Sequence, residues 1–124
     1  MAQERQLIYA FSAGRVAFGV GLLAAPGRIG SSWVGEDARR GGAQVALRGL
    51  GVRDIALAAG AALAAGRGAR VRPWLAGCLA CDLADIAATL AAGDSVPARG
   101  RLGTAALAGA AAAAGAALIA AAER

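Results

Sequence analysis

Six ionisable side chains lie within long apolar segments of this 124-residue chain. A charge at the centre of a bilayer costs about 2.5–3.5 kcal/mol on the insertion scale, so each of them needs a partner. Three are basic and three are acidic, and an arginine guanidinium can grip a carboxylate through two parallel hydrogen bonds. We therefore expect them to form one paired cluster, and we take all six as candidate binding residues: Arg15, Arg48, Arg53, Asp54, Asp82 and Asp85.

Two interpretations of this cluster stay open. In the first, the ion pairs only lock the helices together, because a balanced set of charges can satisfy itself. In the second, the cluster lines a small polar pocket that binds a substrate or relays protons, as ionisable residues within membranes usually do. Asp82 and Asp85 are three residues apart on one predicted helix, so they could share a proton and act as acid and base. They are the candidate catalytic pair.

Cys78 and Cys81 form a C-x-x-C pattern on the same segment and share a helical face with Asp82 and Asp85. They could be a redox pair, as in four-helix membrane quinone/thiol oxidoreductases, although those proteins use a second cysteine pair. They could also bind a metal together with the two carboxylates. Because the chain has no His and no further Cys, we expect core packing instead, and we predict neither a metal nor another cofactor.

Four apolar segments must position these residues. The clearest one covers residues 102–122 without a single charged side chain. As a helix these 21 residues would span roughly 31 Å, close to the thickness of the hydrocarbon core of a bilayer. We predict an all-α fold, a bundle of four antiparallel transmembrane helices that forms a single domain over residues 1–124. The expected helices cover residues 6–25, 43–65, 73–92 and 102–122.

Proline and glycine set the predicted boundaries. Pro26 ends the first helix, and Pro73 suits the first position of the third. The second apolar segment is too long for one straight span, so we expect a short interfacial piece over residues 36–42 before the second helix. The glycines within residues 49–51 indicate a kink or a close contact between helices.

Composition favours a membrane protein over the alternatives. Hydrophobic residues make up 58% of the chain, which excludes intrinsic disorder. Two cysteines are too few for the disulfide framework of a small secreted domain. A soluble alanine-rich bundle would carry a charged face on each helix, and the last segment has none. We therefore expect a multi-pass protein of the cell membrane whose main partner is the lipid bilayer.

The net charge of +5 raises nucleic acid as a partner, but the arginines are scattered and aromatic residues for base stacking are few. We therefore predict no nucleic-acid binding. Two other partners stay open. A second copy of the chain could pack through helix faces of small residues, which would make a homo-oligomer. A lipophilic small molecule could enter the polar pocket.

Two motifs carry a resemblance to a known family. One is the run LRGLGVRDIALA over residues 47–58, and the other is CDLAD over residues 81–85, after a first helix that ends in Ala-Pro. Together they resemble a family of small four-helix integral membrane proteins of uncharacterised function, frequent in high-GC actinobacteria. The resemblance covers most of the chain. It implies a membrane location and a four-helix topology, and it implies no activity.

Three functions are compatible with these observations. The favoured one is a polytopic membrane protein whose Arg/Asp cluster locks the bundle and lines a small polar pocket. The second is an intramembrane enzyme that uses Asp82 and Asp85 as acid and base on a lipophilic substrate. The third is a minimal transporter or proton-coupled conduit whose path is lined by the same charges. A role other than catalysis is favoured.

Overall fold

The computed structural model describes residues 2–122, which are helical apart from short connections. Four long helices form the body of the molecule: α1 (Ala2–Ala24), α3 (Gly41–Gly66), α4 (Arg72–Ala92) and α5 (Ala98–Ala122). Three short helical elements connect them: α2 (Pro26–Val34), η1 (Gly35–Arg39) and η2 (Gly93–Ser95). The predicted all-α class is confirmed, and each of the four long helices is long and apolar enough to cross a membrane.

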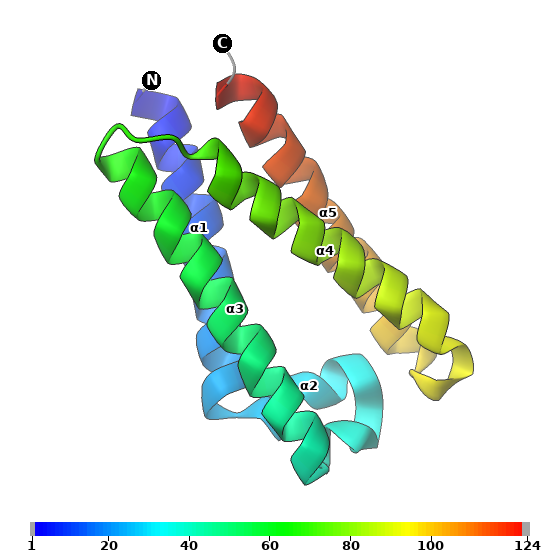
Figure 1. The fold of residues 1–124 in the computed structure, drawn as a ribbon. Helices are drawn as coiled ribbons and strands as arrows, with labels where there is room; N and C mark the ends of the chain where they lie inside the picture. The colour runs from blue at the N-terminus through cyan, green and yellow to red at the C-terminus, as the bar shows by residue number, and fades with distance from the viewer. Residues whose placement is uncertain (1, 123–124) are drawn as a thin grey trace.

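The long helices form two pairs (Figure 1). α1 lies against α3, and α4 lies against α5. The start of α1, the end of α5 and the α3–α4 connection lie together at one end of the molecule, called here the closed end. Away from it the two pairs diverge, and α2 lies across the space between them. Each long helix contributes one buried apolar side chain to a core cluster on the closed-end side: Ile8, Ala61, Leu75 and Leu118.

α1 and α3 approach each other closely because two glycines face one another at their crossing. A Cβ atom on Gly51 would lie 2.6 Å from the carbonyl oxygen of Gly19, and a Cβ on Gly19 would lie 2.6 Å from that of Gly51. No side chain fits at such a distance, so the crossing depends on both glycines. Of the two outcomes expected for residues 49–51, the structure has the close contact, and α3 is one continuous helix through them.

The connection between α1 and α3 differs from the prediction. α2 starts directly at Pro26, because a proline at the first helical position lacks only an N–H that would have no helical partner. Two short helices thus occupy residues 26–39. The second of them, η1, matches the short piece expected over residues 36–42 in part, but it starts at Gly35 and ends at Arg39, and α3 already begins at Gly41. Gly35 ends α2 with a φ of 74°, a left-handed conformation that favours glycine. At the other end of the chain, α5 begins at Ala98 rather than near residue 102.

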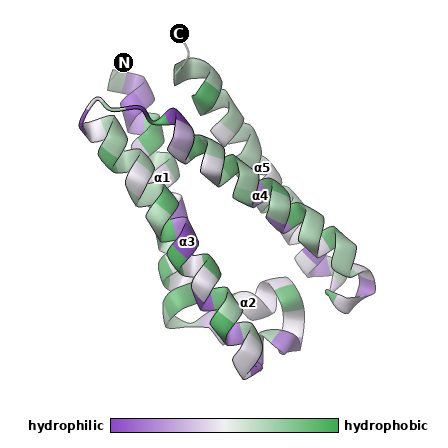
Figure 2. Ribbon diagram, in the orientation of Figure 1, coloured by the Kyte–Doolittle hydropathy of each residue, from purple (hydrophilic) through white to green (hydrophobic). Residues whose placement is uncertain are grey.

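Besides its apolar core, the molecule buries charged side chains and exposes large apolar ones. Arg15, Asp54 and Asp82 are only 8%, 5% and 5% exposed, although such residues are almost never buried unless paired. Figure 2 shows hydrophilic residues gathered towards the helix ends and at the middle of α3. Large apolar side chains face outwards instead, among them Leu7, Val45, Val52, Leu63, Leu83, Leu90 and Leu102.

Candidate functional site

Five of the six candidate residues form one continuous chain of ion pairs, called here the ionic network. Nη1 of Arg15 donates to both carboxylate oxygens of Asp82 at 2.8 Å, and its Nη2 donates to Oδ1 of Asp54 at 3.1 Å. The same oxygen of Asp54 accepts from Nη2 of Arg53 at 3.3 Å. Arg53 also donates to the two oxygens of Asp85 at 3.3 and 2.9 Å. Acidic and basic groups therefore alternate along the network.

Three helices supply the network, each from near its middle. α1 provides Arg15, α3 provides Arg53 and Asp54, and α4 provides Asp82 and Asp85. The pairs around Arg15 are nearly enclosed, whereas the side chains of Arg53 and Asp85 are 28% and 19% exposed. The network therefore ties α1, α3 and α4 together at one level, and its outer end opens towards the surface.

Arg48 does not join the cluster as expected. Its side chain is exposed, and its Nε donates to the carbonyl oxygen of Leu23 at 3.2 Å. Arg48 precedes Arg53 by five residues, so the two side chains leave α3 about 140° apart at 3.6 residues per turn. One helix cannot turn both arginines towards the same partners. The network therefore holds two basic and three acidic groups, not the balanced set of three and three that the sequence predicts.

Three buried polar atoms lack a hydrogen-bond partner within residues 2–122: Ser12 Oγ, Arg15 Nε and Arg53 Nε. Ser12 lies one turn before Arg15 on α1, so its spacing in the sequence already puts it on the same helical face. A buried polar group without a partner loses its hydration and gains no hydrogen bond in return. The charges are therefore all paired, while the polar atoms around them are not all satisfied.

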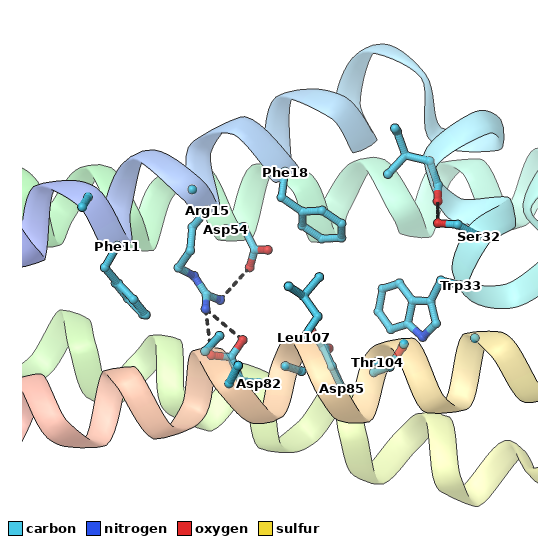
Figure 3. A pocket seen from close by; sticks show the side chains of 18 residues that line it. Phe11, Arg15, Phe18, Ser32, Trp33, Asp54, Asp82, Asp85, Thr104 and Leu107 are labelled. Carbon is cyan, nitrogen blue, oxygen red and sulfur yellow. Dashed lines mark hydrogen bonds and ion pairs between the residues drawn. The ribbon is translucent and has the colours of Figure 1, made fainter.

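A cavity of about 570 Å³ lies beside the network, within the range typical of small-molecule sites. Figure 3 shows Arg15, Asp54 and Asp82 gathered at one part of it, with Phe18 and Trp33 further along. Asp85 also lines the cavity. The remaining wall is mostly apolar, and α5 supplies a large part of it: Gly100, Gly103, Thr104, Leu107, Ala108, Ala110 and Ala111.

Trp33 on α2 bounds the cavity and ties its two walls together. Its Nε1 donates to Oγ1 of Thr89 on α4 at 3.0 Å, and that hydroxyl donates to the carbonyl oxygen of Asp85 at 2.6 Å. The carbonyl of Trp33 also packs directly onto Gly100, where a Cβ atom would not fit. Trp33 has no predicted role because α2 is missing from the prediction. The sequence signal for α2 is Pro26, because proline is favoured at the first position of a helix, and a helix predicted from it would have included Trp33.

The acid–base pair, the cysteine pair and the metal site considered from the sequence are not formed as the ionic network is. Asp82 and Asp85 each accept from a different arginine, and among the described residues no hydrogen bond joins the two carboxyl groups. Cys78 and Cys81 are free thiols, and Cys78 is completely buried. Within residues 2–122, no three His, Cys, Asp or Glu side chains are arranged to hold a metal ion.

The arrangement has two chemical capacities. It holds three helices together through buried charge, and it presents carboxylates to an apolar cavity. No family model, curated protein or solved structure matches this chain.

Proposed function

We propose that this chain is a multi-pass protein of the cell membrane that binds a lipophilic small molecule in the cavity between its two helix pairs. The ionic network locks α1, α3 and α4 together and forms the polar wall of the cavity. One observation carries this proposal: a mostly apolar cavity of about 570 Å³ reaches charges buried in the middle of the molecule. Such a site accommodates the apolar part of a ligand between its walls and orients the polar group of the ligand against the network.

The exposed apolar side chains and the buried charges support the membrane location. Leucines such as Leu63, Leu90 and Leu102 are more than half exposed, and they would contact lipid chains. The network residues lie near the middle of their helices, at the depth where charge is most costly and pairing matters most. Successive long helices run in opposite directions in Figure 1, so the four spans would form an antiparallel bundle in the bilayer.

A binding pocket has more support than the conduit or the enzyme. A conduit needs a polar path to both ends, and the apolar cluster of Ile8, Ala61, Leu75 and Leu118 lies between the network and the closed end. An acid–base pair needs one carboxyl group that can give up or take a proton. Both Asp82 and Asp85 instead accept hydrogen bonds from a guanidinium group.

Fractionation of cells that express the full chain tests the membrane location. We expect the protein to sediment with the membranes, to resist extraction by alkaline carbonate and to be released by dodecyl maltoside. A soluble reporter protein in the same cells controls for cytosol trapped in the pellet. Recovery of the chain in the soluble fraction without detergent would contradict the proposal.

Filling the cavity tests the binding site. Gly103 lines the cavity and Gly109 does not, although both lie on α5 and a Cβ atom on either would meet nothing within 4 Å. We expect Gly103→Leu to weaken binding of a neutral lipophilic dye, N-phenyl-1-naphthylamine, by about tenfold or more, a loss of at least 1.4 kcal/mol. The matched variant Gly109→Leu should bind the dye like the parent chain.

Energy transfer from Trp33 to the dye is the measurement. Trp74→Phe removes the other tryptophan of the chain, so that all transfer comes from the cavity. The protein is reconstituted in nanodiscs, and empty nanodiscs correct for dye that dissolves in lipid. Equal dye binding by Gly103→Leu and Gly109→Leu would rule out this cavity as the binding site.

A further inference from the structure

We propose that the cavity selects lipophilic cations, that is, organic molecules with one positive charge and an apolar body. The inference rests on the proposed function, because it names the charge of the ligand in the same cavity. Three observations carry it: the balance of charge in the network, an unused carboxylate oxygen, and the aromatic side chains of the wall.

The charges around the cavity do not cancel. Of the described residues that line it, Arg15 alone is basic, and three are acidic: Asp54, Asp82 and Asp85. Arg53 pairs with two of these acids, which still leaves the whole network with one carboxylate more than it has guanidinium groups. Arg48 cannot correct the balance because its side chain faces outwards. In a setting of low dielectric constant, such a site attracts a cation strongly and repels an anion.

Asp54 offers the contact that a cation would use. Its Oδ1 accepts from both Arg15 and Arg53, while its second carboxylate oxygen accepts no hydrogen bond within residues 2–122. The residue is 5% exposed and lines the cavity, so this oxygen is held in place and lies next to the ligand space. The unpartnered donors, Nε of Arg15 and of Arg53, are enclosed, so an anion in the cavity could not reach them.

The wall suits a positive charge that is carried on an apolar body. Phe18 and Trp33 line the cavity, and aromatic ring faces attract cations. The Arg15 guanidinium already lies 5.7 Å from the centre of the Phe11 ring, so Phe18 and Trp33 are the rings left for a ligand. A small hydrated ion would have to shed its water into these apolar surroundings. An organic cation with a dispersed charge loses little hydration on entering, and its apolar part packs against α5.

Two probe ions of the same shape and opposite charge test the inference: tetraphenylphosphonium and tetraphenylborate. Each displaces the neutral dye from the full chain in nanodiscs of phosphatidylcholine, which carries no net charge. Empty nanodiscs of the same lipid give the signal from lipid alone. We expect the cation to bind at least about tenfold more tightly than the anion.

Three substitutions locate the source of the preference. Asp54→Asn keeps the shape and an acceptor for the arginines but balances the network, so we expect the preference to fall below about threefold. Asp85→Asn removes one acid at the more exposed end and should have the same effect. Asp94→Asn is the control, because Asp94 pairs with Arg101 on the surface and does not line the cavity. The preference should persist in this control.

The outcomes separate this inference from the function on which it rests. If the dye binds and the two ions displace it with equal affinity, the cation preference is overturned and the binding site stands. A proton bound to one carboxyl group of the network would give this result, because it cancels the excess negative charge. A cation preference that survives both Asp54→Asn and Asp85→Asn would also overturn the inference, and if Asp54→Asn fails to fold, Asp85→Asn decides. Failure of the dye to bind would overturn the proposed function itself.

Discussion

Arg15→Met is expected to lower the free energy of unfolding of the detergent-solubilised protein by about 3–5 kcal/mol. Arg15 supplies the hydrogen bonds to both oxygens of Asp82 and one of the two that reach Asp54. Methionine keeps much of the length of the side chain but leaves Asp82 with no basic partner and Asp54 with only Arg53. Asp54 and Asp82 are each 5% exposed, so hydration compensates for only a small part of the lost contacts. Denaturation followed by circular dichroism measures the change.

Two further variants show whether the loss comes from buried charge. Arg48→Met removes an exposed arginine from the same molecule and should change stability by no more than about 0.5 kcal/mol. The double variant Arg15→Met/Asp82→Leu removes the stranded carboxylate together with its partner, so it should be more stable than Arg15→Met alone. Equal stability of Arg15→Met and Arg48→Met would mean that the network contributes little to the fold.

Gly51→Ala is expected to destabilise the protein by about 1–3 kcal/mol, even though alanine is the better helix former. The added methyl group would meet the carbonyl oxygen of Gly19 at 2.6 Å and the Cβ of Leu22 at 3.1 Å. The first of these is a backbone atom, so no change of side-chain rotamer can relieve the clash. The two helices have to separate, and the contacts on either side of the crossing weaken with them.

Gly49→Ala is the matched control on the same helix. Gly49 is exposed, and a Cβ atom there would meet nothing within 4 Å. The substitution should leave stability unchanged or raise it by about 0.5–1 kcal/mol, the advantage of alanine over glycine within a helix. Thermal unfolding of both variants in the same detergent gives the comparison. A loss of similar size at both positions would mean that the cost does not come from the crossing, because alanine is the better helix former at either position.

The charged residues made the centre of the site predictable. A charge within an apolar helix needs a partner, and that requirement alone predicts that Arg15, Arg53, Asp54, Asp82 and Asp85 pair with one another. Depth along a helix does not determine direction around it, which is why Arg48 belongs to the same predicted set and yet faces outwards. Angular spacing along α3 would have separated Arg48 from Arg53.

The cavity was harder to predict than the network. It exists because the two helix pairs diverge, and the divergence is bounded by α2 through the Trp33–Thr89 hydrogen bond and the packing of Trp33 on Gly100. These contacts join residues that are far apart in the chain and ordinary in type. Pro26 has two local meanings, the end of one helix or the start of another, and here it begins α2 immediately after α1.

The ion pairs of Arg15 join residues that are far apart in the sequence, and this has a consequence for biosynthesis. Asp54 and Asp82 follow Arg15 by 39 and 67 residues. At a synthesis rate of about 5–20 residues per second, the partners of Arg15 are made roughly 2–8 s and roughly 3–13 s after it. In the membrane location proposed above, α1 would therefore reach the insertion machinery with its charge unmet. Its release into lipid would wait for helices not yet translated, so that α1, α3 and α4 enter the bilayer as one unit.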